Sequence, residues 1–220
     1  MKNLLVALVL AVFCSCSTSC STLNATSVAP ATEAVAQAGI VPHIILSTEI
    51  DDNTAQQAIA AFDAADMMKV KTVLFEINSP GGSVDAGFLI AKAIENSNAN
   101  VICVVDAMAA SMAFYILQSC DIRVMTDRSL LMAHEPAIRA GIGGKSEDWR
   151  KQGNGIADLL EALTKSMNHH MARRLTISYE EFSKRIHNTE YWMTAEEALK
   201  ISAVDQVVAS VKEVKEILSQ

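Results

Sequence analysis

A serine and a histidine, placed in two separate apolar segments, are the residues of this chain best suited to chemistry. Ser111 follows the strand-like run 101–105 and a few small residues, and it precedes the helix-forming run Met112–Leu117. A hydroxyl at such a junction lies near the unpaired N–H groups and the positive dipole end of the helix, which favour developing negative charge. His134, at the end of a second apolar run, can take the hydroxyl proton. The pair predicts a serine hydrolase, and the alternative is that Ser111 only caps a helix.

A glycine-containing turn provides the second candidate element. Asn-Ser-Pro-Gly-Gly-Ser (78–83) comes directly after a strand-like run that ends at Ile77. Two glycines allow the backbone to turn sharply and to bring N–H groups close to a ligand. We expect the N–H groups of Gly82 and Met112 to form an oxyanion hole. The lysine and the further glycines of a phosphate-binding loop are missing, so the turn is not predicted to bind phosphate.

The elements that must position these residues alternate along the chain. Strand-like runs cover 44–46, 72–77, 101–105, 122–125, 130–133 and 204–208. Helical patterns cover 54–68, 84–95, 112–117 and 146–175, and short helices follow the capping positions Ser178 and Thr194. This alternation predicts an α/β fold of βα units around a largely parallel sheet. The long helix has an apolar face that includes Ile156, Leu159, Leu160, Leu163 and Met167.

Length and charge limit the classes of protein. The 220 residues, of which 50% are hydrophobic, are enough for one good core, and a second full domain is not expected. The net charge is −7, and no cluster of basic residues exceeds the pair Arg173–Arg174. A nucleic-acid partner is therefore not expected.

The N-terminus resembles a targeting segment. Lys2 precedes the apolar run Leu4–Phe13, which is too short to span a bilayer but fits the core of a secretory signal peptide. We expect a signal peptide over 1–22, a linker over 23–41 and one folded domain over 42–220. Lipidation after cleavage would use Cys14, Cys16 or Cys20, of which Cys16 is best placed. The expected location is the periplasm or, for a lipoprotein, a membrane tether; the alternative is a short hydrophobic tail that is never cleaved.

Two cysteines remain in the folded part. Cys103 and Cys120 both have apolar neighbours in the sequence, which favours buried small side chains over a disulfide or a metal site. The chain contains no CxxC or HExxH pattern. We therefore predict neither a metal nor another cofactor.

Four segments in this order resemble the ClpP-type serine peptidases. They are Asn-Ser-Pro-Gly-Gly-Ser-Val-Asp-Ala-Gly (78–87), Met-Ala-Ala-Ser-Met (108–112), Met-Ala-His-Glu-Pro (132–136) and the closing segment 192–205, which is most similar to phage-type members. The resemblance covers about 49–208. It implies a ClpP/crotonase-type fold of stacked ββα units, protomers that assemble into homo-oligomeric rings, Ser111 as nucleophile and His134 as general base.

The resemblance also implies a third catalytic residue. The family carries an acidic residue, usually Asp, two positions before the aromatic residue of the closing segment. Trp192 is that aromatic residue here, so Glu190 takes the acidic position. A glutamate can orient the imidazole, although its extra methylene requires a different backbone approach. Asn188 is the alternative, and Glu135 is a further one if it points inward.

Departures from the family pattern leave alternatives open. Ala107 and Ala113 stand where the family often has glycine, and the N-terminal hairpin that docks onto an ATP-driven unfoldase has no counterpart. An exported protein meets no ATP, so we expect peptides or unfolded segments as substrates and no ATPase partner. A Ser-Lys peptidase of the signal-peptide-peptidase type would need Lys145 or Lys92 near Ser111. A non-catalytic scaffold subunit is the remaining alternative.

Overall fold

The computed structural model describes residues 41–137 and 146–219, and side chains after the gap from Gly153 onward. The expected signal peptide, nearly all of the linker, Cys14, Cys16, Cys20 and Lys145 lie outside these residues. The strands are β1 (His43–Leu46), β2 (Thr72–Ser79), β3 (Asn100–Ala110), β4 (Ile122–Thr126), β5 (Leu130–Ala133), β6 (Tyr191–Met193) and β7 (Gln206–Val208). The helices are α2 (Asp52–Met67), α3 (Val84–Asn96), α4 (Met112–Leu117), α5 (Ser146–Ala172), α6 (Tyr179–Ile186), α7 (Ala195–Lys200) and α8 (Val211–Leu218).

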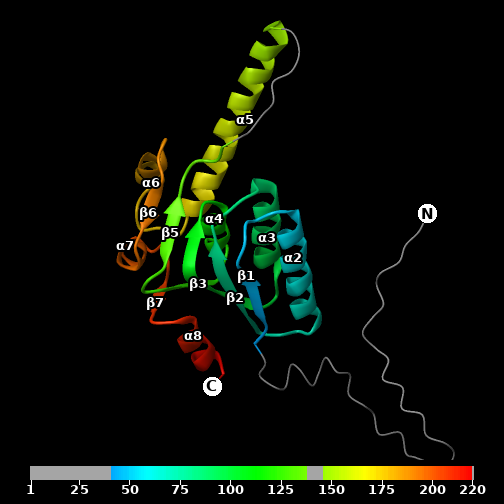
Figure 1. The fold of residues 1–220 in the computed structure, drawn as a ribbon, viewed down its shortest axis with the longest axis vertical. Coiled ribbons are helices and arrows are strands. Elements are labelled where there is room, and N and C mark those ends of the chain that lie inside the picture. The colour runs from blue at the N-terminus through cyan, green and yellow to red at the C-terminus, as the bar shows by residue number, and fades with distance from the viewer. Residues whose placement is uncertain (1–40, 138–145, 220) are drawn as a thin grey trace, which may run out of the picture.

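The strands form one largely parallel sheet, as the sequence predicts (Figure 1). Its main path runs β1-β2-β3-β4-β7, and every pair along this path is parallel. The long strand β3 pairs with β4 through Ile102–Val105 and then with β5 through Met108–Ala110. β5 in turn pairs with the antiparallel edge strand β6. The carboxyl ends of β3 and β5 therefore lie side by side.

Alternating residues of β2 and β3 point into two separate apolar layers, as the two-residue period of a strand requires. One layer contains Val73, Phe75, Ile77, Val101, Cys103 and Val105, and α2, α3 and α4 cover it. The opposite face contains Leu74, Ile102, Val104, Val124 and Val208, and Val211 and Val214 of α8 cover it. Helices on both faces explain why these strands are apolar throughout.

Two helices, α6 and α7, begin at the capping residues that the sequence indicates. Ser178 and Thr194 accept hydrogen bonds from the N–H groups of Glu181 and Glu197. Asp51 caps α2 in a capping box with Thr54, although the capping of this helix was not predicted. These side chains satisfy N–H groups that would otherwise be unpaired at the helix start.

The long helix α5 extends away from the sheet (Figure 1). Among its described side chains, from Gly153 onward, Met167 and Met171 near the C-terminal end are buried, whereas Leu159 is 53% exposed. The predicted apolar face is therefore covered over part of its length. Within residues 41–137 and 146–219, none of the helices combines the length and the apolar character needed to cross a membrane.

Candidate active site

Ser111 occupies the sharp turn between β3 and α4. Its backbone has φ 55° and ψ −119°, a left-handed conformation that is strained for a residue with a side chain. The turn is held from both sides. Ala110 pairs with Met132 of β5, and the N–H of Ser111 donates to the carbonyl of Met132 at 2.8 Å. Ser111 makes no side-chain capping bond to α4, so its hydroxyl is available for another partner.

That partner is His134, which follows β5. Its Nε2 lies 2.7 Å from Ser111 Oγ. The contact follows from the topology, because β3 and β5 are parallel and both residues stand just beyond the carboxyl ends of their strands. With the ring proton on Nδ1, Nε2 accepts the hydrogen bond from the serine hydroxyl and can take its proton. The sequence-predicted pair is thus brought together in hydrogen-bonding geometry.

The Pro-Gly-Gly turn packs directly against the serine. A Cβ atom on Gly81, whose φ is 98°, would lie 2.7 Å from the carbonyl oxygen of Ala110 and 2.8 Å from Ser111 Cβ. Only a glycine allows this approach. Gly82 forms a parallel β-bridge with Ile50. The two hydrogen bonds of this bridge join Ile50 N–H to the Gly81 carbonyl and Ser83 N–H to the Ile50 carbonyl, so neither uses the N–H of Gly82.

Two backbone donors remain beside the hydroxyl. Within the described part of the chain, no hydrogen bond occupies the N–H of Gly82, and the N–H of Met112, the first residue of α4, has no intrahelical partner. A Cβ on Gly81 would also lie only 2.9 Å from the Met112 nitrogen, so the turn that carries Gly82 approaches the start of α4 closely. The two unpartnered N–H groups therefore lie in segments that pack against each other at the serine turn, and they are the candidate donors for an oxyanion hole.

Glu190 stands opposite His134 but is not hydrogen-bonded to it. The antiparallel pairs Leu131–Met193, Met132–Trp192 and Ala133–Tyr191 define a register in which the next pair would be His134 and Glu190. Directly opposed residues of this kind are within reach of each other. In the structure, however, Glu190 Oε2 accepts a hydrogen bond from Trp192 Nε1 at 3.0 Å. Among the described residues, no carboxylate is hydrogen-bonded to the imidazole of His134.

The neighbouring carboxylate of Glu135 points elsewhere. It contacts His187 Nδ1 at 3.1 Å and accepts a hydrogen bond from the N–H of Asn188 at 3.2 Å. Asn188 has φ 54°, a conformation that asparagine tolerates better than most residues. Glu135 and Asn188 therefore hold the loop before β6 in place, and neither is joined to His134.

A pocket opens beside the pair. It has a volume of about 500 Å³, and both apolar and polar side chains line it. Its lining consists of His134, Glu135, Pro136, Ala137, Leu160, Ile186, Asn188, Thr189 and Glu190. The site can therefore accommodate a side chain next to the base.

No contact in the described structure supports the alternative of a Ser-Lys dyad. Lys92 is exposed on α3, and no hydrogen bond joins it to Ser111. Lys145 lies outside the described residues. Within these residues, no group of His, Cys, Asp and Glu side chains could hold a metal ion.

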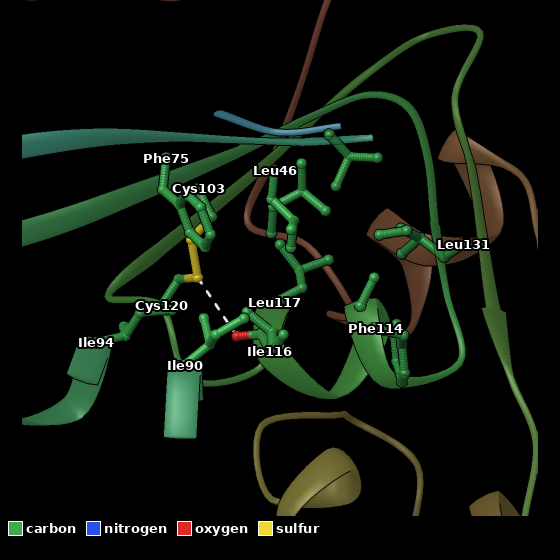
Figure 2. Close-up of a cluster of buried hydrophobic side chains, with 14 of the residues drawn as sticks. Leu46, Phe75, Ile90, Ile94, Cys103, Phe114, Ile116, Leu117, Cys120 and Leu131 are labelled. Carbon is green, nitrogen blue, oxygen red and sulfur yellow. Dashed lines mark hydrogen bonds between the residues drawn. A yellow bond between two sulfur atoms is a disulfide. The ribbon is translucent and has the colours of Figure 1, made fainter. Parts of the chain in front are cut away.

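The expectation for the two cysteines was wrong, because Cys103 and Cys120 form a disulfide with a Cα–Cα distance of 5.9 Å (Figure 2). Both residues are buried, at 0% and 1% exposure, in the apolar layer with Phe75, Ile90 and Leu117. Their sequence spacing alone gave no sign that β3 and the end of α4 approach each other. The covalent bond closes a loop that contains Ser111.

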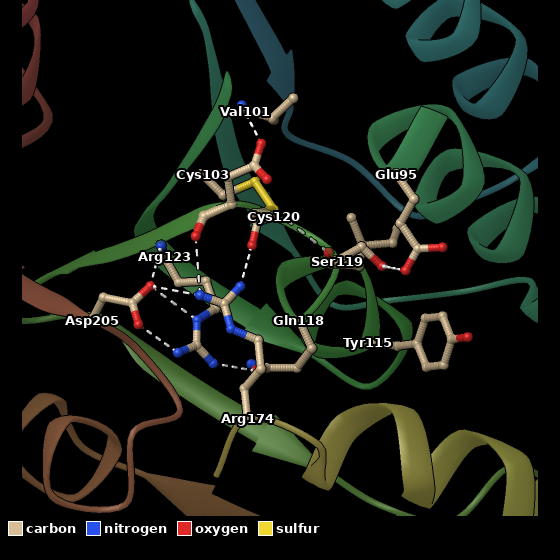
Figure 3. The surroundings of a disulfide bond; sticks show 12 residues. Glu95, Val101, Cys103, Tyr115, Gln118, Ser119, Cys120, Arg123, Arg174 and Asp205 are labelled. Carbon is tan, nitrogen blue, oxygen red and sulfur yellow. Dashed lines mark hydrogen bonds and ion pairs between the residues drawn. A yellow bond between two sulfur atoms is a disulfide. The ribbon is translucent and has the colours of Figure 1, made fainter. Parts of the chain in front are cut away.

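A buried polar network lies beside the disulfide and is bonded to the end of the same loop (Figure 3). Arg123, which is 2% exposed, donates to Gln118 Oε1 at 2.6 Å and forms a two-pronged contact with Asp205. Arg174 of the segment after α5 donates to the carbonyl of Cys120 and to Asp205. Burial works to raise the pKa of Asp205, but the hydrogen bonds and charges of Arg123 and Arg174 outweigh it and lower that pKa. The network joins residues far apart in the sequence and was not predicted.

The parallel sheet places Ser111 and His134 in hydrogen-bonding contact, near two N–H groups without a partner. This arrangement is typical of a serine hydrolase. Comparison with known proteins identifies the family of hydrolases. The family profile of the Clp protease matches residues 31–211. The chain therefore belongs to the Clp protease family, and it is a serine-type peptidase.

Curated relatives agree with this assignment. The ATP-dependent Clp protease proteolytic subunit 1 of Protochlamydia amoebophila is 30% identical over 176 residues, which cover 78% of this chain and 82% of the relative. The ATP-dependent Clp protease proteolytic subunit of Streptococcus pyogenes serotype M5 is 32% identical over 173 residues, which cover 75% of this chain and 83% of the relative. The similarity spans most of each protein.

Proposed function

We propose that this chain is an exported serine endopeptidase that uses Ser111, His134 and Glu190, with the N–H groups of Gly82 and Met112 as its oxyanion hole. The observation that carries the proposal is the 2.7 Å contact between Ser111 Oγ and His134 Nε2 beside those two free donors. The membership in a protease family supports the choice of a peptide bond as the substrate.

The groups act in sequence. Ser111 Oγ attacks the peptide carbonyl carbon as its proton passes to His134 Nε2, and the carbonyl oxygen becomes an anion that the two N–H groups stabilise. The imidazolium then gives its proton to the leaving amine, which leaves an ester on Ser111. A water molecule hydrolyses this ester by the same steps, with His134 again as base. Glu190 would stabilise the imidazolium in both halves of the reaction.

Export draws support from the fold as well as from the N-terminal pattern. A disulfide between Cys103 and Cys120 is typical of proteins that fold in an oxidising compartment and is rare in the cytosol. We propose that residues 1–22 direct the chain to the periplasm and that lipidation, at Cys16 or its neighbours Cys14 and Cys20, tethers it to the membrane. The protein would then have a bacterial or phage origin.

The relatives carry the description ATP-dependent, and this chain would differ from them. An exported protease meets no ATP, so we propose that it forms homo-oligomeric rings without an unfoldase and cleaves peptides or unfolded segments that enter unaided. Co-purification of an ATP-driven unfoldase with the native protein would contradict this part of the proposal.

Covalent labelling with a fluorophosphonate probe tests the catalytic groups. We expect the wild type to be labelled, the Ser111→Ala and His134→Ala variants to lose labelling, and Lys145→Ala to retain it. Loss of labelling with Lys145→Ala and not with His134→Ala would support a serine–lysine dyad instead. A folded, ring-forming wild type that is not labelled would indicate a non-catalytic scaffold.

A further inference from the structure

Trp192 contributes a hydrogen-bond donor beside the site that no catalytic role yet explains. Its indole Nε1–H donates to Glu190 Oε2 at 3.0 Å. Residues 190 and 192 are two positions apart along an extended segment, so both side chains emerge on the face that His134 shares. Trp192 is 43% exposed, which is unusual for so large an apolar ring.

The indole and the imidazole compete for one carboxylate. An indole N–H can only donate, and so can the Nδ1–H of His134 when Nε2 accepts from Ser111. The strand register places Glu190 opposite His134, yet its carboxylate accepts a hydrogen bond from Trp192. In this arrangement the imidazolium formed during catalysis would lack its counter-ion.

We propose that Trp192 is a positioning residue that holds the Glu190 carboxylate in a resting place, and that the triad becomes complete when this hydrogen bond is released. The proposal rests on the proposed function, because it assigns Glu190 to the triad. The indole N–H of tryptophan provides this donor, whereas a phenylalanine ring at the same position has none.

The chemistry itself favours the exchange. While His134 is neutral, its Nδ1–H and the indole N–H are both neutral donors, and the resting contact persists. Once His134 takes the serine proton, the ring carries a positive charge, so its Nδ1–H binds the carboxylate as an ion pair and more strongly than the neutral indole does. The carboxylate is then drawn from Trp192 to His134. The short edge strand β6 and the exposure of both side chains keep this movement inexpensive.

Steady-state kinetics against pH on a peptide substrate, with Trp192→Phe, Glu190→Gln and the double variant, test the proposal. We expect Trp192→Phe to raise kcat by on the order of tenfold, the bias that one hydrogen bond to a charged group gives a two-state equilibrium, with little change in KM. The acidic limb of kcat/KM should move to higher pH, because a carboxylate on His134 favours the imidazolium. In the Glu190→Gln background the same substitution should have no effect.

The indole resonance provides a readout that does not depend on activity. The chain has two tryptophans, so Trp192→Phe assigns the indole N–H signal in a ¹H–¹⁵N spectrum. Glu190→Gln should shift that signal. An unshifted signal, or a Trp192→Phe variant with unchanged or lower kcat, would overturn the proposal.

The two proposals fail separately. If Glu190→Gln keeps the kcat and the pH profile of the wild type, Glu190 is not in the triad, and both the assignment and the resting place are wrong. If Glu190→Gln lowers kcat while Trp192→Phe has the same effect with or without Glu190, the triad stands and only the role of Trp192 is overturned.

Discussion

The two halves of the active site are built in different ways. The serine half is buried, since Ala110 and Met112 are 2% and 1% exposed, and the disulfide closes its loop. The proposed acid, Glu190, directly precedes β6, a three-residue edge strand; it is exposed, and Trp192 is its only hydrogen-bond partner among the described residues. Ser111 is therefore fixed by packing, whereas Glu190 is held by one exposed hydrogen bond, and the proposed change of partner requires only that this bond break.

The difference follows from the cost of each conformation. A left-handed backbone at Ser111 costs about 1–3 kcal/mol and persists only where the surroundings impose it. Gly81, the paired strand β5 and the buried Arg123 network provide such surroundings. Glu190 has no such strained backbone and is exposed, so it does not need buried surroundings of this kind.

Gly81→Ala should break the serine half with the largest effect. The new Cβ would lie 2.7 Å from the Ala110 carbonyl oxygen at a backbone φ of 98°, and Ser111, Met112 or the turn must shift. Displacement of one oxyanion donor costs about 10²–10³-fold in kcat. We expect a loss of this size, measured as kcat on a peptide substrate with the folded fraction checked by circular dichroism.

Gly153→Ala is the matched control for this substitution. Gly153 lies in α5, and a Cβ there meets nothing within 4 Å. The change should leave kcat unaltered and stabilise the helix by up to about 1 kcal/mol. Equal effects of the two substitutions on kcat would show that the close approach of Gly81 to Ser111 does not matter for catalysis.

Removal of the disulfide tests the covalent support of the same half. Cys103→Ala with Cys120→Ala should lower the free energy of unfolding by about 3 kcal/mol, the value expected for a closed loop of this length. Denaturant unfolding measures the change. A reductant should lower the stability of the wild type and leave the double variant unaffected, and a wild type that is insensitive to reductant would show that the cysteines are unpaired.

The sequence predicted the serine half better than the acid half. Ser111, the helix Met112–Leu117 and the strand that precedes His134 all follow from local patterns, because apolar runs and a strand-to-helix junction are local features. The largely parallel sheet, which was predicted from the alternation of such local runs, is confirmed. The contact of Ser111 with His134 required only that two adjacent strands be parallel.

Features that depend on distant residues were missed. The strand β6 is too short for a periodic signal, and its register with β5, which places Glu190 opposite His134, comes from tertiary pairing. The disulfide joins residues 17 positions apart whose approach depends on how α4 packs under β3. The helix α8 was missed for another reason, since its local signal, the capping residue Ser210 three positions before Glu213, was present in the sequence but not used.

Substitution of His170, which packs against α4, is expected to have the smallest effect of these changes, and the effect is on stability. Its ring, on α5, stacks on Tyr115 of α4 with a centroid distance of 4.0 Å, and Nε2 lies 3.1 Å from both Ser119 Oγ and the Tyr115 carbonyl. Burial, with the charge of Arg173, lowers its pKa to about 4, against the opposing effects of the Tyr115 carbonyl and Glu95.

The folded state therefore favours the neutral ring. An unfolded chain takes up this proton near pH 6.5, so the contribution of His170 is complete above that pH and is lost as the pH falls from about 6.5 towards 4. The shift allows about 3 kcal/mol at most, which solvent screening of the partly exposed ring reduces to about 1–2 kcal/mol. His170→Gln, which keeps a donor for the Tyr115 carbonyl, should flatten the dependence of unfolding free energy on pH in this window. His169→Gln, which removes the exposed imidazole next to it, should retain the wild-type slope, and an unchanged slope in His170→Gln would assign the acid sensitivity to another group.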